Sequence, residues 1–174
     1  MAAPLDLATL PKVELHVHLE GTVSAATART LAAGHGEDPD AVLLLEGDGY
    51  PHPFRDFEHF LAAFLATAAQ VRTPDDLRTI AAAFAAGQAA QRVRWSEATF
   101  TAAMMESRGW EPAAMWAALS EGLTAAPGAD VGLILDTPRD MGPAMARRTV
   151  ELAADALAAG APVVGLGLTG IEGS

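Results

Sequence analysis

Residues 13–18 read Val-Glu-Leu-His-Val-His, and this alternation of apolar and polar side chains predicts a short β-strand. Pro11 before the run and Gly21 after it mark its limits. Similar signals recur later in the chain, and they predict three more strands over 92–101, 131–136 and 163–168. The first strand therefore opens a series of four.

Helical patterns lie between these strands. A helix is predicted from Ser24, a suitable N-cap, to His35, and the stretch 38–53 is expected to be a loop because it is rich in glycine and proline. The remaining helices are predicted over 57–70, 73–90, 111–125 and 142–159. Strands that alternate with helices predict an α/β protein with a parallel sheet, built either as an open doubly wound sheet or as a (β/α)8 barrel of the TIM type.

Chain length limits what a barrel could contain. A (β/α)8 barrel needs eight strands and about 250 residues, whereas this chain has 174 residues. On the barrel interpretation, residues 1–174 form a single domain that covers about the first four β/α units. Such a half barrel has two open sheet edges, which favour self-association. We therefore expect a longer natural polypeptide, two copies that close around each other, or a truncated product.

Composition and charge restrict the possible functions. With 51% hydrophobic and 19% charged residues, the chain has the composition of a soluble globular protein, and its apolar runs are too short for a membrane span. A formal net charge of -11 disfavours nucleic acid as a partner. The absence of cysteine leaves any metal to His, Asp and Glu ligands. Residues 1–10 do not resemble a secretory signal, so a cytoplasmic enzyme or binding protein is expected.

His16 and His18 are the first candidate site. Residues two apart in a strand point to the same face, so the two imidazoles are expected side by side at the end of the first strand. The carboxyl end of a parallel strand is where both barrel and open α/β enzymes place their chemistry. The pair is therefore half of a metal site, or else a solvent-facing or hydrogen-bonded pair.

Other side chains are candidates on weaker signals. Asp136 ends the third strand and Glu172 follows the fourth, so each could join a metal site, cap a helix or face solvent. Glu97 could face inward as a structural carboxylate. The remaining histidines are expected to be ordinary surface or pocket residues: His35, His52 and His59. An apolar helix face, expected to pack in the core, is formed by Phe57, Phe60, Leu61, Phe64 and Leu65.

The string from Leu10 to Thr22, Leu-Pro-Lys-Val-Glu-Leu-His-Val-His-Leu-Glu-Gly-Thr, resembles the start of the adenosine deaminase family. Members of this family are zinc-dependent hydrolases with a (β/α)8 barrel fold, and they include adenosine, adenine and aminofutalosine deaminases. Weaker resemblance continues at 95–101, at Arg139 and at 168–172, so it spans the chain. The resemblance implies that the chain is the N-terminal half of such a barrel.

The resemblance also implies roles for individual residues. His16 and His18 would bind zinc, and His18 and Glu20 would approach the substrate. The mouth of the purine pocket would be lined by Phe60, Leu61 and Phe64, and the backbone of Gly170 would contact the base. Glutamate at position 20, in place of the aspartate usual in adenosine deaminases, looks more like the adenine deaminase branch. Gly167 and Ile171 stand where the family usually has aspartates.

The implied reaction is the hydrolytic deamination of a small purine, adenosine to inosine or adenine to hypoxanthine. Zinc would lower the pKa of a water toward about 7 for attack on purine C6, with ammonia leaving. The family takes its third histidine ligand, its aspartate ligand and its catalytic glutamate and histidine from strands five to eight, beyond Ser174. The alternatives are a catalytically incomplete remnant, a self-associating half barrel without deaminase activity, and an unrelated flavodoxin-like binding domain.

Overall fold

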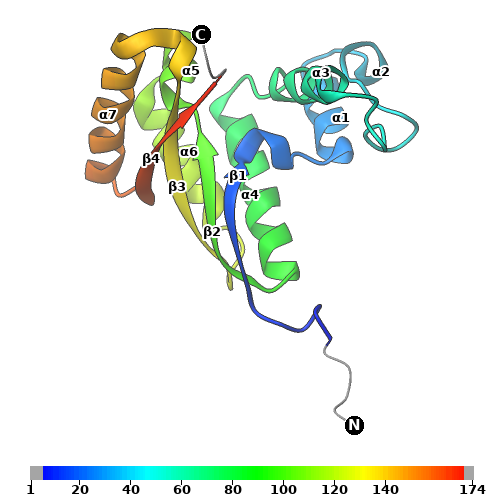
Figure 1. Ribbon diagram of the computed structural model, residues 1–174, viewed down its shortest axis with the longest axis horizontal. Coiled ribbons are helices and arrows are strands. Elements are labelled where there is room, and N and C mark those ends of the chain that lie inside the picture. The colour runs from blue at the N-terminus through cyan, green and yellow to red at the C-terminus, as the bar shows by residue number, and fades with distance from the viewer. Residues whose placement is uncertain (1–5, 171–174) are drawn as a thin grey trace.

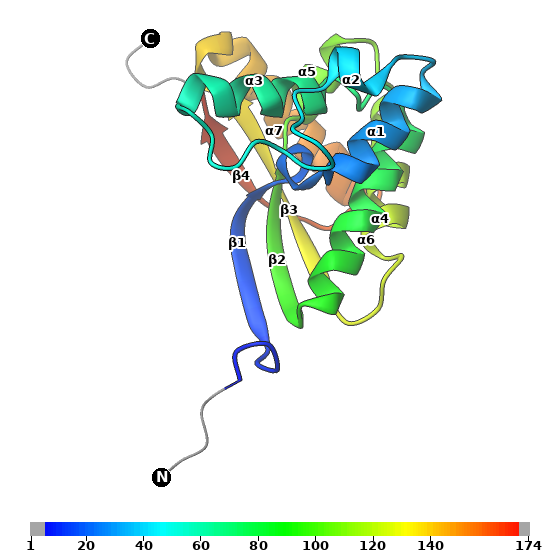
Figure 2. The ribbon, with the colours of Figure 1, turned by 90° about the vertical axis from the view of Figure 1, so that its right-hand side faces the viewer.

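A computed structural model describes residues 6–170 and places four parallel strands in one sheet (Figure 1, Figure 2). In spatial order they are β1 (Lys12–His18), β2 (Val93–Phe100), β3 (Asp130–Pro138) and β4 (Val163–Thr169). An open doubly wound sheet reverses its strand order at a switch point. Because the order is consecutive through the described residues, the flavodoxin-like alternative is wrong, and the sheet has the strand order of a barrel segment.

Three long helices cover one face of the sheet, and they are α4 (Pro74–Ala90), α6 (Pro112–Leu123) and α7 (Gly142–Ala158). Leu133 and Leu135 of β3 are fully buried in the apolar cluster between the sheet and this layer. Each helix contributes a leucine that is also fully buried in this cluster: Leu77, Leu119 and Leu152. The core therefore lies between the sheet and the three helices, as alternating strand side chains require.

The opposite face of the sheet is closely packed around a glycine. A Cβ atom on Gly132 would lie 2.6 Å from Val164 Cγ2 and 2.9 Å from Trp95 Cζ2. These distances are too short for real contacts, so the approach of β2, β3 and β4 at this point depends on the absence of a side chain.

The other helical elements gather at the carboxyl ends of the strands, the end opposite the N-terminus in Figure 2. They are η1 (Leu19–Thr22), α1 (Ala25–Gly34), α2 (Pro39–Val42), α3 (Phe57–Ala68), α5 (Ala102–Ser107) and η2 (Arg139–Met141). The segment 38–53 is thus not loop throughout, because Asp38 caps α2 by accepting a hydrogen bond from the Asp40 N–H. Helix α5 follows β2 directly, and its six residues are too few to show an apolar period.

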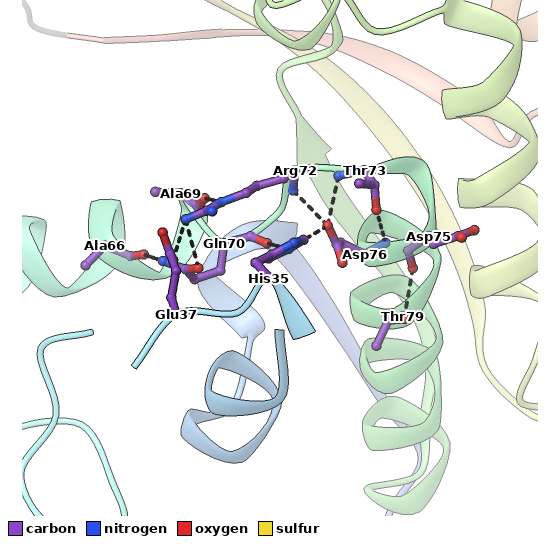
Figure 3. Close-up of polar contacts among 10 residues, drawn as sticks. All are labelled: His35, Glu37, Ala66, Ala69, Gln70, Arg72, Thr73, Asp75, Asp76 and Thr79. Atoms are coloured by element: carbon purple, nitrogen blue, oxygen red, sulfur yellow. Dashed lines mark hydrogen bonds and ion pairs between the residues drawn. The ribbon is translucent and has the colours of Figure 1, made fainter. Parts of the chain in front are cut away.

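A polar network joins the ends of α1, α3 and α4 (Figure 3). His35 Nε2 lies 3.2 Å from the carbonyl oxygen of Gln70 and 3.2 Å from Asp76 Oδ2. Both neighbours are acceptors, so Nε2 carries a hydrogen. Asp76 also closes the capping box of α4, accepting from the Thr73 N–H at 2.8 Å. His35, which was expected to be a surface or pocket residue, is half-buried and links the loop after α3 to the start of α4.

Helix α3 departs from the expected core packing. Two of its three phenylalanines are exposed, Phe57 by 70% and Phe60 by 42%, and Phe64 is half-buried, while Ala63 and Thr67 are buried. The helix contacts η1 beyond the carboxyl end of β1, and it does not lie over the core between the sheet and α4, α6 and α7 (Figure 1, Figure 2). The prediction that its apolar face packs in the core is therefore wrong. None of the helices among residues 6–170 combines the length and the apolar character needed to cross a membrane.

Candidate active site at the carboxyl end of the first strand

An irregularity in β1 determines the positions of His16 and His18. The register between β1 and β2 shifts between Glu14 and Val17, so that two residues of β1 stand opposite one residue of β2. His16, inside this β-bulge, has a positive φ of 62°, a left-handed conformation that is uncommon for a residue with a Cβ atom. The ring centroids of His16 and His18 lie 5.6 Å apart. The predicted juxtaposition is confirmed, although the strand between them is bulged, as strands often are beside active sites.

A hydrogen bond orients the second histidine. His18 Nδ1 lies 3.0 Å from Thr99 Oγ1 on β2, and the same hydroxyl donates to the carbonyl oxygen of Val17 at 3.4 Å. With its one hydrogen used in this way, Thr99 Oγ1 accepts from the His18 Nδ1–H. This leaves Nε2 with a free lone pair, the form in which an imidazole binds a metal.

Glu20 lies just beyond β1 in the η1 turn and is buried, with 8% of the residue exposed. Burial raises the pKa of its carboxyl from 4.5 to about 7, because the charged form loses its hydration. A hydrogen bond to its own backbone lowers the pKa, the charge of Asp136 raises it, and the charge of Arg108 lowers it. At neutral pH this carboxyl can both donate and accept a hydrogen bond.

Asp136 lies at the carboxyl end of β3 and is only 2% exposed. Its Oδ1 accepts a hydrogen bond of 2.7 Å from Thr101 Oγ1, at the end of β2. The expected alternatives of helix capping and solvent exposure are therefore both wrong. Asp136 is a buried, hydrogen-bonded carboxyl at the same end of the sheet as the histidines, where the strands have their carboxyl ends.

A cavity of about 160 Å³ lies beside the carboxyl end of β1. Its lining includes Glu20 and Gly21 of η1 and the aromatic side chains of Tyr50, Phe54, Phe60 and Phe64. A Cβ atom on Gly21 would lie 3.4 Å from Phe64 Cε2 and 3.7 Å from His18 Cβ, so the cavity wall touches the backbone beside the histidine. Tyr50 comes from the predicted loop, and Phe54 lies between that loop and the predicted helix over 57–70. No periodic pattern distinguishes these two residues, and only the fold brings them here.

The remaining predicted residues lie outside the cavity lining. Leu61 is 37% exposed and does not line the cavity. Gly170 has a φ of 92° and packs on the η2 turn, where a Cβ atom would lie 3.1 Å from Arg139 N. A Cβ atom on Gly167 would lie 3.2 Å from Asp136 Cβ, so this position favours a small residue. The predicted residues Ile171 and Glu172 fall outside the described residues.

The donor set fits part of a zinc site. His16 and His18 supply two imidazoles, and zinc sites in proteins use three or four protein ligands. No three His, Asp or Glu side chains among residues 6–170 are grouped closely enough to hold a metal ion. His59 is not available, because it is 9% exposed and its Nδ1 accepts from the Arg55 N–H at 3.2 Å. The described residues therefore offer two imidazoles that could bind zinc, and not a complete site.

Comparison with known proteins identifies relatives that match nearly the whole length of this chain. The family model described as adenosine deaminase matches residues 11–174. The aminodeoxyfutalosine deaminase of Streptomyces coelicolor is 34% identical, over 95% of this chain and 43% of its own length. The adenine deaminase of the same organism is 35% identical, over 99% of this chain and 51% of its own length. The chain thus spans about half the length of the curated relatives it matches.

Solved structures show the same relation. An amidohydrolase from Burkholderia ambifaria with bound zinc superimposes with a TM-score of 0.74 at 26% identity, covering 97% of this chain and 46% of that protein. The adenine deaminase of Arthrobacter aurescens gives a TM-score of 0.70 at 26% identity, covering 93% and 49%. The sheet and its helices are therefore about the first four units of a (β/α)8 barrel.

Proposed function

The chain belongs to the adenosine deaminase family, and we propose on that basis that it takes part in the zinc-dependent hydrolytic deamination of a purine nucleoside or base. In this reaction water replaces the amino group on purine C6, which gives inosine or hypoxanthine and releases ammonia. The observation that carries the proposal is the histidine pair at the carboxyl end of β1, next to the cavity lined by Glu20.

His16 and His18 would hold the metal from one side. When bound, zinc supplies a water activated for attack at neutral pH and polarises the reacting centre. The bond from His18 to Thr99 keeps the ring oriented and its Nε2 available. The carboxyl of Glu20 would hydrogen-bond the substrate from the cavity side, while Phe60 and Phe64 would exclude water from an apolar portion of the substrate.

Zinc retention tests the ligand assignment. In the longest available form of the protein we expect zinc to be retained after gel filtration, and we expect His16→Ala and His18→Ala to reduce the zinc content to background, as measured by elemental analysis. His52→Ala is the matched control, because this exposed histidine lies in the loop before α3. Ammonia release from adenosine and adenine tests the reaction separately. Full activity of the His16→Ala protein would overturn the assignment, and zinc-dependent activity of the 174-residue chain would refute the incomplete-remnant alternative.

A second candidate function, self-association of the half barrel, is favoured by the two edge strands. Val13 and Leu15 on β1 are 61% and 58% exposed, and Leu166 and Leu168 on β4 are 55% and 61% exposed. Exposed edges of this kind pair readily with another chain. Light scattering during gel filtration should report at least a dimer for the 174-residue chain, and Leu166→Asp should shift it toward monomer. A monomer at all concentrations would contradict this candidate.

A further inference from the structure

The sheet face that α4, α6 and α7 leave uncovered carries the histidine pair. Ala98 and Phe100 of β2 are buried on the helix side, so Thr99 between them faces the opposite way. His18 pairs with Thr99 in the sheet, and its Nδ1 lies 3.0 Å from the Thr99 hydroxyl, so its ring is on this face too. The ring of His16 lies beside it. Both imidazoles therefore belong to the face that forms the interior of a barrel.

The same face carries exposed apolar side chains next to two open sheet edges. Val13 of β1 pairs with Trp95, and Trp95 lies with Val164 of β4 against Gly132. Val13 is 61% exposed and Val164 is 51% exposed. Among residues 6–170, β1 and β4 each have a strand partner on one side only. Closure of the sheet into a barrel would pair both edges and bury these side chains.

A second copy of this chain has the right strands for that closure. The four parallel strands follow one another in the sheet, and they are half of the eight in a (β/α)8 barrel. A two-fold axis along the barrel places β1 of each copy beside β4 of the other, so the two junctions are equivalent and parallel. The two β1 strands then lie on opposite sides of the barrel. Because the interior of an eight-stranded barrel is just wide enough for side chains, their inward side chains meet near the axis.

The chemistry of the histidine pair favours the same partner. Zinc takes three or four protein ligands, and no three His, Asp or Glu side chains among residues 6–170 are grouped closely enough to bind it. The bond to Thr99 leaves Nε2 of His18 free to bind a metal. Two copies bring four imidazoles to the barrel axis, which is enough for a complete ligand set. The metal site that one chain leaves incomplete is completed by the second.

We propose that two copies of this chain close one eight-stranded barrel around a shared zinc ion, held by His16 and His18 of both copies. The inference rests on the zinc ligands of the proposed function but not on the deamination itself. It also differs from association through the sheet edges alone, which needs no metal. Because the metal binds the dimer better than the monomer, zinc binding and dimerisation strengthen each other.

The dependence of dimerisation on zinc tests the shared site. The 174-residue chain is stripped of metal with a chelator, and its mass is followed by light scattering over a range of protein concentrations, with and without added zinc chloride. We expect zinc to lower the dimer dissociation constant at least about tenfold. Elemental analysis of the dimer should give one zinc per two chains. His16→Ala and His18→Ala should each abolish the zinc effect, whereas His52→Ala, at an exposed histidine before α3, should keep it.

A matched pair of valines tests the closure of the barrel. Val13→Asp places a carboxylate inside the closed barrel with no partner for its charge, so it should weaken the zinc-bound dimer at least about tenfold. Val150→Asp is the control, because Val150 is 53% exposed on α7 and lies outside the proposed contact. Urea melts of both variants check that each monomer still folds.

Several results would overturn the shared site. One zinc per chain in a monomer, or a dimer whose dissociation constant does not change with zinc, would each refute it. A zinc effect that persists in His16→Ala and His18→Ala would assign the association to other surface groups. Equal losses in Val13→Asp and Val150→Asp would place the contact elsewhere. Ammonia release is measured separately, so a zinc-bound dimer that does not deaminate adenosine or adenine refutes the proposed reaction and leaves the shared site standing.

Discussion

The buried carboxyl of Glu20 should make the stability of this chain fall as the pH rises. Its pKa is about 7 in the folded chain against an ordinary value of 4.5, and a difference of this size corresponds to about 3 kcal/mol. Because the folded state binds this proton more tightly than the unfolded state, the stabilisation is fully present below pH 4.5 and is lost as the pH rises through about 7.

Glu20→Gln removes the titration while keeping the size of the side chain. Between pH 5.5 and pH 8 the wild-type chain should lose about 2 kcal/mol that the variant does not lose. The measured quantity is the difference in unfolding free energy between the two proteins at each pH, because a constant cost of the amide and the titration of other groups then cancel.

Urea unfolding followed by tryptophan fluorescence provides the assay, with a chelator present so that metal binding at His18 does not contribute. Glu46→Gln is the matched control, since Glu46 is exposed, and its stability difference from wild type should be the same at both pH values. If the difference between wild type and Glu20→Gln is also independent of pH, the carboxyl does not titrate near neutrality and the reasoning from burial fails.

Four further substitutions test the packing and the site. His35→Ala should lower the unfolding free energy by about 1–3 kcal/mol in urea melts, because it leaves two acceptors at the α1, α3 and α4 junction without their shared donor; no change would mean that the network is incidental. Gly132→Ala should cost about 1–3 kcal/mol because its Cβ would overlap Val164, whereas Gly87→Ala, inside α4 with open space around it, should stabilise by up to about 1 kcal/mol. Equal effects at the two glycines would contradict the overlap. Thr99→Val should weaken zinc binding about 10-fold to 100-fold, measured by competition with a chelating dye, because it removes the bond that orients His18; unchanged affinity would show that the ring needs no such support.

The order of elements could be predicted because it depends on local patterns. The alternation over 13–18 and the apolar runs near 131–136 and 163–168 match β1, β3 and β4 within a few residues. The capping residues Ser24 and Thr73 mark the starts of α1 and α4, since each accepts a hydrogen bond within the first turn. Short elements such as α2 and α5 were not predicted, because four or six residues do not establish a period.

The sequence by itself determined the alternating α/β pattern, the family through residues 10–22, and the pairing of His16 with His18. Only the tertiary structure decided which face of α3 is buried, which groups surround Glu20, and which loop residues complete the cavity. The physical reason is that the periodicity of helices and strands, and the capping of helices, depend on a few residues that are neighbours in the sequence. Burial, by contrast, depends on segments far apart in the chain. Glu20, Tyr50 and Phe64 share one cavity only because η1, the following loop and α3 meet at the carboxyl end of the sheet.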